Sequence, residues 1–336
     1  MARPYVTLQT ENRVEEYKQE ARRNLGRFLA FGDVVGILLN GGLARGYADH
    51  LSEIDITVFL SHEQYERYRR GKTPLPTGIA IIDGLLYDVK LEDYDEALAT
   101  DFSMAALWDL SYAEVLYDPQ GKLAHLIQEK LSQPVDVSRA ERFLFEAWWN
   151  FRLAGDIWIH RGDIAQGHFV LNNAVKPLVS ALFIANREYV PHDKWLIHMS
   201  RTLAWKPAGW EEKLAQAMST GGFDKESLAS RQAALAELWS AVDQKLQETL
   251  GAGVSVMQRY YYDGLRILVE RSRMPLEEWQ ALGKGGLLNA EPFHSITRVE
   301  DGMIVLDEER VAAVQPEDMY SWFYEVVQAV RTEGLR

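Results

Sequence analysis

The sequence predicts an α+β fold in which a small sheet-containing domain precedes a long helical region. Three observations predict it. Short runs of isoleucine, valine and leucine, divided by glycines, characterise the N-terminal third of the chain. Helical spacing of apolar residues dominates from about residue 137 to residue 273. The tryptophans follow the same division, because all 10 lie at or after Trp108.

The first domain is predicted over residues 1–135. It opens with a helix over 12–31, whose apolar residues recur at helical spacing and which stops before Gly32. The helix is followed by short runs that are either wholly apolar or alternate between apolar and polar residues, and by one polar stretch of helical type. We expect strands over 34–39 and 54–60, a helix over 62–70 and a further strand over 113–117.

The clearest local signal is a β-hairpin. Asp83 and Gly84 separate the strand-like runs 79–82 and 85–91. A two-residue hairpin turn needs a positive φ at both positions, and Asp-Gly is among the pairs that adopt it.

The rest of the chain is predicted to be a helical bundle with a small appendage. The bundle spans residues 136–275, and its helices are antiparallel and joined by short turns. The appendage spans 276–336 and contains a second Asp-Gly turn, Asp301-Gly302, between strand-like runs. A final helix is predicted over 316–331.

Composition and charge exclude several classes of function. The 336 residues carry 36 Lys and Arg against 49 Asp and Glu, a formal net charge of −13, which disfavours a nucleic-acid partner. The absence of cysteine excludes disulfides, thiolate metal sites and a cysteine nucleophile. No apolar run reaches the roughly 18 residues that a membrane span needs, and the first residues lack the apolar segment of a signal peptide. We therefore expect a cytoplasmic protein without a membrane partner.

Residues suited to chemistry gather around the first predicted strands. A buried strand ends at Gly41-Gly42, where the backbone N–H groups that open a helix attract phosphate. Glu53 and Asp55 stand two positions apart on the next strand, so their carboxylates share one face. Asp88 lies on the second arm of the hairpin. Three carboxylates beside a glycine turn predict a site for Mg²⁺ and a triphosphate; the alternative is a plain turn beside the solvent face of an edge strand.

The order of these features resembles the signature of the DNA polymerase β-like nucleotidyltransferase superfamily. An apolar strand and a Gly-Gly turn are followed, after ten residues, by an acid–apolar–acid strand that begins at Glu53, and later by a third acid. The resemblance covers about residues 30–120. More loosely, residues 171–178 and 186–196 resemble the bundle that follows this domain in antibiotic-modifying and related bacterial members.

The resemblance implies a reaction and a role for each residue. Glu53, Asp55 and Asp88 would hold Mg²⁺, and Gly41 and Gly42 would hold the β- and γ-phosphates of an NTP co-substrate. The implied reaction transfers a nucleoside monophosphate, AMP in the first place, to a hydroxyl of a small molecule and releases pyrophosphate. The acidic chain favours a cationic acceptor such as an aminoglycoside-like compound.

Two positions depart from the family pattern. Leu43 follows the glycine pair where serine is usual and cannot hydrogen-bond a phosphate; Ser52 and Tyr47 are the available substitutes. Glu53 stands where aspartate is common. Its side chain is one methylene longer, which shifts the carboxylate relative to the near-ideal octahedral geometry that Mg²⁺ demands. These departures leave a catalytically degraded nucleotide-binding or interaction module as one alternative function. A protein- or RNA-modifying nucleotidyltransferase is another, although RNA calls for a basic groove.

Three further residues are candidates for the site. Arg45 follows the glycine turn and is either a phosphate contact or an ordinary helix-surface arginine. Glu146 lies among aromatic residues of a helix over 139–160, where desolvation would raise its pKa toward the range of a general base; the alternative is a solvated rim glutamate. Lys176 precedes a proline inside a helical pattern and is either a triphosphate ligand or a solvated lysine. The sequence predicts no oligomeric state.

Overall fold

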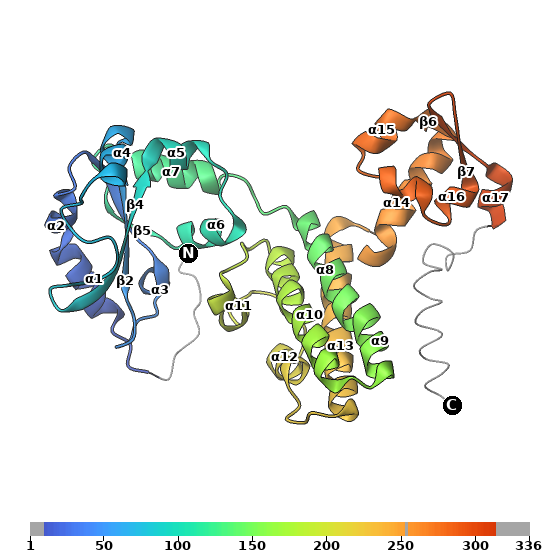
Figure 1. The fold of residues 1–336 in the computed structure, drawn as a ribbon, viewed down its shortest axis with the longest axis horizontal. Helices are drawn as coiled ribbons and strands as arrows, with labels where there is room; N and C mark the ends of the chain where they lie inside the picture. The colour runs from blue at the N-terminus through green and yellow to red at the C-terminus, as the bar shows by residue number, and fades with distance from the viewer. Residues whose placement is uncertain (1–9, 253–254, 314–336) are drawn as a thin grey trace. The chain divides into compact units, whose positions relative to one another are not determined.

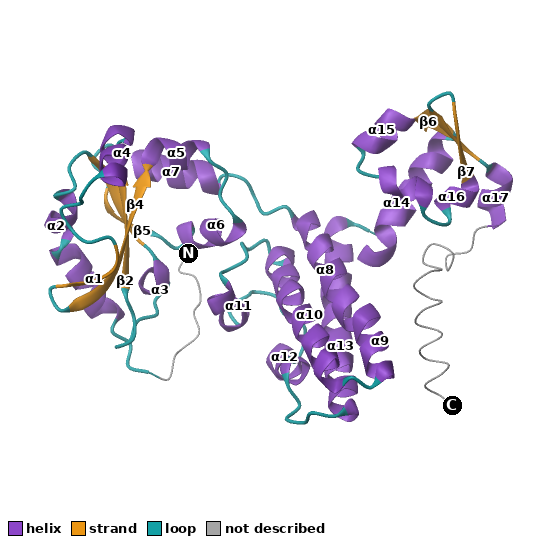
Figure 2. Cartoon of the chain, viewed as in Figure 1, coloured by secondary structure: helices purple, strands orange, loops and turns teal. Residues whose placement is uncertain are grey.

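The predicted α+β class is confirmed, since a five-stranded mixed sheet with helices is followed by a largely helical region. The computed structural model describes residues 10–252 and 255–313. They form two compact units, coloured along the chain in Figure 1 and by secondary structure in Figure 2. Among the described residues, the first unit contains 10–136 and 186–204, and the second contains 137–185, 205–252 and 255–313.

The first unit is built on a sheet with the strand order β3-β4-β2-β1-β5. β2 and β4 are parallel, and the other neighbours are antiparallel. The predicted strands are confirmed, and they extend over β1 (Val34–Leu39), β2 (Ile54–Leu60), β3 (Gly78–Ile82), β4 (Leu85–Asp93) and β5 (Glu114–Tyr117). The hairpin is confirmed as well, because Asp83 and Gly84 have φ values of 50° and 81°.

The helix predicted over 12–31 is divided into α1 (Val14–Arg23) and α2 (Leu25–Leu29). Asn24 separates them with φ −83° and ψ 0°. Its buried side chain donates from Nδ2 to the hydroxyl of Tyr87, 2.9 Å away on the sheet. The break lets this side chain reach the sheet, a tertiary requirement that apolar periodicity does not show.

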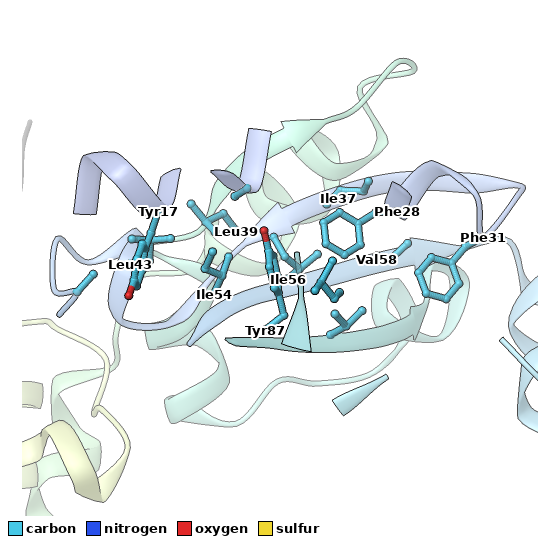
Figure 3. Close-up of a cluster of buried hydrophobic side chains, with 14 of the residues drawn as sticks. Tyr17, Phe28, Phe31, Ile37, Leu39, Leu43, Ile54, Ile56, Val58 and Tyr87 are labelled. Atoms are coloured by element: carbon cyan, nitrogen blue, oxygen red, sulfur yellow. The ribbon is translucent and has the colours of Figure 1, made fainter. Parts of the chain in front are cut away.

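Alternation along β2 gives the sheet two different faces. Ile54, Ile56 and Val58 point into a core that contains Tyr87 and aromatic residues of α1 and α2 (Figure 3). Phe59 belongs to a second core on the other face. The helices around these cores are α4 (His62–Arg70), α5 (Tyr94–Ala99), α6 (Met104–Leu110) and α7 (Lys122–Leu131).

A segment remote in the sequence completes the first unit. Residues 186–204 fall within the range 136–275 predicted as the bundle, yet they pack with the sheet domain. They contain α11 (Asp193–Ser200), whose Trp195 and His198 rings lie 5.1 and 5.2 Å from the ring of Tyr47. Tyr47 lies three residues after the end of α3 (Gly41–Ala44), and a Cβ built on Gly42 would lie 3.6 Å from Trp195, so this segment reaches the glycine turn.

The second unit is a helical bundle in which α10 packs on α8 and α13. Its helical segments are α8 (Ala140–Trp148), a π-helical turn (Trp149–Ala154), α9 (Gly155–Arg161), α10 (Ile164–Ala185), α12 (Trp210–Met218), α13 (Lys225–Leu250) and α14 (Val256–Arg271). By length and composition alone, α10 is the single helix of the described residues that could cross a membrane. Because 72% of its most apolar window is buried inside the protein, it resembles the core helix of a bundle, and the indication of a span is weak.

The C-terminal part contains a small sheet of order β6-β8-β7. The strands are β6 (Arg273–Pro275), β7 (Thr297–Glu300) and β8 (Met303–Leu306), and the helices around them are α15 (Leu276–Ala281), α16 (Phe293–Ile296) and α17 (Glu308–Ala313). The second Asp-Gly turn is confirmed by positive φ values at Asp301 and Gly302. The helix predicted over 316–331 lies outside the described residues.

Candidate functional site

The glycine turn and the first strand acid meet at one point. The N–H of Asn40 donates to the carbonyl of Asp55 over 3.0 Å, which holds the end of β1 against the start of β2. Gly41 follows with a φ of +65°, and a Cβ built on it would lie 1.7 Å from Oδ2 of Asp55. The carboxylate of Asp55 thus occupies the space that any larger residue at position 41 would need.

The first turn of α3 has no side-chain cap. Asn40 stands before it, and asparagine is a frequent N-cap. Its Nδ2 instead donates to Oγ1 of Thr57 at 2.6 Å. The opening N–H groups of a helix lack intrahelical acceptors, so those of α3 are suited to an anion beside Asp55. Packing also favours a glycine at position 42, since a Cβ there would lie 2.9 Å from the carbonyl oxygen of Tyr47.

Further carboxylates surround Asp55. The parallel register of β2 and β4 places Asp88 directly opposite it, Glu53 comes immediately before β2, and Asp109 lies on α6. The pKa of Asp55 is raised from 3.8 to about 6, chiefly because burial penalises the charged carboxylate. The charge of Glu53 contributes to this rise, and Lys90 opposes it. The predicted acids Glu53, Asp55 and Asp88 therefore lie in one electrostatic neighbourhood.

Lys90 is a cation of this neighbourhood that the sequence reasoning did not select. It stands two positions after Asp88 and therefore on the same face of β4. Its Nζ lies 3.3 Å from Oδ2 of Asp88, and its side chain is more than half exposed. The sequence could have identified Lys90, because side chains two positions apart on a strand such as β4 point to the same face.

Arg45 is not a surface arginine. Its side chain is only 2% exposed and forms an ion pair with Asp109. The guanidinium lies between two indoles, 4.4 Å from the ring of Trp108 on α6 and 4.9 Å from that of Trp195 on α11. This arrangement links α3 to two other elements of the first unit. The role of Arg45 as a phosphate contact stays a prediction, and its charge already has a partner.

One departure from the family pattern, Leu43, has a structural explanation. Leu43 is 1% exposed and belongs to the core in Figure 3, so its side chain points away from solvent. Ser52 Oγ accepts a hydrogen bond from the N–H of Asp49 at 3.0 Å. The hydroxyl of Tyr47 lies 3.5 Å from the sulfur of Met199. Both residues named as substitutes for the missing serine are thus engaged in local packing.

Glu146 and Lys176 belong to the second unit, on α8 and α10 respectively. Glu146 is exposed. Lys176 is exposed too. The residues that the structure brings together are the glycine turn, Arg45 and the three acids of the first unit.

A pocket of about 420 Å³ opens on the sheet face that carries Thr57 and Lys90. The lining is mixed, with apolar side chains and an excess of carboxylates over cations. Its carboxylates are Glu92, Glu96 and Asp109. His192 reaches the pocket from the segment 186–204, which no sequence motif linked to this domain.

The carboxylates around Asp55 would supply only part of the shell of a magnesium ion. Within residues 10–252 and 255–313, no three acidic or histidine side chains converge on a single metal position. Mg²⁺ is commonly held by one or two carboxylates and completes its shell with water and substrate phosphates. Burial and the neighbouring acids raise the pKa of Asp55, so its ionised form is unfavourable there, and a divalent cation would stabilise that form. Glu53 and Asp88 are the neighbouring carboxylates.

Comparisons with known proteins found only distant similarities for this chain. A family model described as a domain of unknown function (DUF4037) matches residues 100–196. That range includes Trp108, Asp109 and Trp195, the three residues around Arg45. No match was found among curated proteins.

One solved structure similar to the chain is that of a nucleotidyltransferase-like protein from Exiguobacterium sibiricum 255-15. The identity is 11% and the TM-score 0.41, with 86% of this chain and 98% of the other covered. The class reached is therefore an α+β chain with distant similarity to a nucleotidyltransferase-like protein. Neither comparison bears on catalysis or substrate.

We expect Gly41→Ala to destabilise the protein more than Gly46→Ala, by about 2 kcal/mol, because only the first substitution forces a methyl group into Asp55. Both glycines have positive φ, so both variants share a backbone cost of about 1 kcal/mol. A Cβ at Gly46 meets nothing within 4 Å. Urea unfolding of the two variants measures the difference, and equal losses would contradict the contact.

Asp55→Asn is expected to stabilise the protein at pH 8 and to leave its stability unchanged near pH 3.5. The folded-state pKa lies above the ordinary one, so ionisation of Asp55 costs stability progressively between pH 3.8 and about 6, and the full cost remains above that range. Asparagine removes this cost, which at about 1.4 kcal/mol per pKa unit amounts to about 3 kcal/mol.

The measurement is urea unfolding as a function of pH in EDTA, with the exposed Asp101→Asn as the matched control. A gain of equal size at every pH, or an equal gain in the control, would show that the burial of Asp55 is not the cause. Excess Mg²⁺ should reduce the gain, because a bound cation stabilises only the ionised carboxylate.

Proposed function

We propose that this protein is a Mg²⁺-dependent nucleotidyltransferase. It would move a nucleoside monophosphate, AMP in the first place, from an NTP to a hydroxyl of a small molecule and release pyrophosphate. The observation that carries the proposal is the direct contact between Gly41 and the carboxylate of Asp55. It would join an anion-binding turn to a metal-binding acid, which is what the resemblance to the polymerase β-like superfamily implies.

The chain's own groups have separate tasks in this reaction. The uncapped amides at the start of α3 bind phosphate oxygens beside Asp55. Asp55, with Glu53 and Asp88, would hold Mg²⁺, and the ion when bound supplies neutralisation of the triphosphate charge. Lys90 is placed on the same face to contact a phosphate and to release Asp88 when it does so.

The acceptor is proposed to be a hydroxyl compound that also carries an amine. The pocket beside the acids has Glu92, Glu96 and Asp109 in its lining, against Lys90 as the one Lys or Arg among the described residues that line it. Asp109 is already paired with Arg45, which leaves the two glutamates to receive an ammonium group. An apolar wall that includes Phe59 and Phe102 suits the carbon skeleton of such a molecule.

A degraded nucleotide-binding module is a second candidate because of one observation. Leu43 is part of the hydrophobic core, Ser52 Oγ accepts the N–H of Asp49, and the hydroxyl of Tyr47 lies against the sulfur of Met199. In that case the turn and the acids bind nucleotide and metal without turnover. The two functions differ in a single measurable step, the release of pyrophosphate.

The test is pyrophosphate release from ATP, GTP, CTP and UTP in MgCl₂, with a panel of amino alcohols and aminosugars and a matched panel of neutral polyols. We expect the largest release with ATP and an amine-bearing acceptor. Asp55→Asn should lower it by about a hundredfold or more, since the variant loses a metal-binding charge. Asp101→Asn should leave it unchanged.

Three outcomes have separate meanings. Release that persists in Asp55→Asn contradicts the metal assignment. Binding of ATP without release from any acceptor selects the degraded module. Equal release with neutral polyols overturns the choice of an amine-bearing acceptor and keeps the transferase.

A further inference from the structure

The end strand β3 has an exposed apolar surface. It is the last strand of the order β3-β4-β2-β1-β5, so one side of its backbone faces away from the sheet. Ile79 and Ile81 are 65% and 74% exposed, and Leu86, which pairs with Ile81 across the hairpin, is 38% exposed. These three side chains form a continuous aliphatic patch next to an open strand edge.

The other end strands of the two described sheets are protected against pairing with a further strand, and β3 is not. Natural sheets protect their edges with charged residues or prolines. β5 carries Glu114, β6 carries an arginine and Pro275, and β7 carries Arg298 and Glu300. β3 reads Gly-Ile-Ala-Ile-Ile, without a charge or a proline. An edge of this composition associates with another strand unless something covers it.

The hairpin determines which backbone groups of β3 point outward. The two-residue turn makes Ile82 and Leu85 a hydrogen-bonded pair, and such pairs alternate along an antiparallel ladder. Ala80 therefore bonds to β4, while the N–H and C=O groups of Ile79 and Ile81 point away from it. The residues with outward backbone groups are the same residues whose side chains are exposed.

We propose that β3 pairs with β3 of a second copy of this chain, antiparallel and centred on Ala80. In this register Ile79 exchanges both hydrogen bonds with Ile81 of the partner subunit, and the reverse pair follows by two-fold symmetry. Four isoleucines then lie together on one face. On the other face two alanines oppose each other at the axis and allow a close approach. No charge is placed opposite a like charge.

A second copy fits this edge because the strand is its own complement. β3 offers equal numbers of outward hydrogen-bond donors and acceptors, an apolar face and a small residue at its centre. A strand that pairs with β3 needs the same three properties. The acid sites of both copies lie on the same face of the joined sheet, because the two-fold axis of this antiparallel pair is perpendicular to the sheet. Ile79 lies opposite Asp88, so the interface begins one strand away from the acids. The proposal does not depend on the reaction proposed above.

Sedimentation velocity of the full chain over a range of concentrations tests the pairing. The wild type should sediment as a dimer, at twice 38.4 kDa. The double variant Ile79→Lys/Ile81→Lys places lysines opposite lysines and should weaken the dimer by about a hundredfold or more. Val299→Lys makes the same kind of change at an exposed position of β7 and should leave the mass unchanged.

A cross-link tests the register with a variant that keeps the strand intact. The chain has no cysteine, so Ala80→Cys introduces the sole thiol of each copy. Non-hydrogen-bonded partners have Cα atoms about 4.5 Å apart, within the range that a disulfide spans. Ala80→Cys should become a covalent dimer with diamide and revert with dithiothreitol. Ile79→Cys, offset from its own copy in this register, should cross-link at least about tenfold more slowly.

A wild type that stays monomeric at all concentrations overturns the proposal. A dimer that survives in Ile79→Lys/Ile81→Lys overturns it as well, since the interface then lies elsewhere. Equal cross-linking of the two cysteine variants rejects the register centred on Ala80. Circular dichroism of each variant separates loss of pairing from loss of folding.

Discussion

The first unit is organised around the contact between the backbone at Gly41 and the carboxylate of Asp55. Asp55 is largely withdrawn from water and surrounded by other acids, so its charged form is unfavourable unless something compensates it. The glycine turn packs directly against this carboxylate, and the first turn of α3 has no side-chain cap. A glycine at position 41 and an acid at position 55 are therefore one feature, although thirteen residues separate them.

A second buried charge holds the surroundings of that contact in place. Arg45 is removed from solvent, and a buried arginine requires a paired acid, which Asp109 provides. The two indoles on either side of the guanidinium add cation–π attraction of the order of 1–2 kcal/mol. Trp108 and Trp195 come from opposite ends of the region that the family model matches. That region thus contributes to the surroundings of the glycine turn even though its sequence shows no motif for it.

Local patterns predicted a large part of this structure because they depend on short-range chemistry. The Asp-Gly turns were predictable since a two-residue hairpin needs positive φ at both positions, and the alternation along β2 since successive side chains point to opposite faces. The same alternation predicted a shared face for Glu53 and Asp55, whereas β2 begins only at Ile54 and Glu53 lies just before it. The break at Asn24 was missed because it depends on a hydrogen bond to Tyr87, distant in the sequence. Lys90 was overlooked although the same period of two along β4 places it beside Asp88.

The sequence by itself determined the α+β class, the strands and the turns, because each has a local signature in spacing or residue type. The metal-binding role of the three acids stays a prediction. The tertiary structure decided what surrounds them. It buried Arg45 between two tryptophans, left Glu146 in solvent and brought His192 to a pocket of the sheet domain. The physical reason is that burial and pairing of a charge depend on residues that are distant along the chain, and the spacing of one segment carries no information about them.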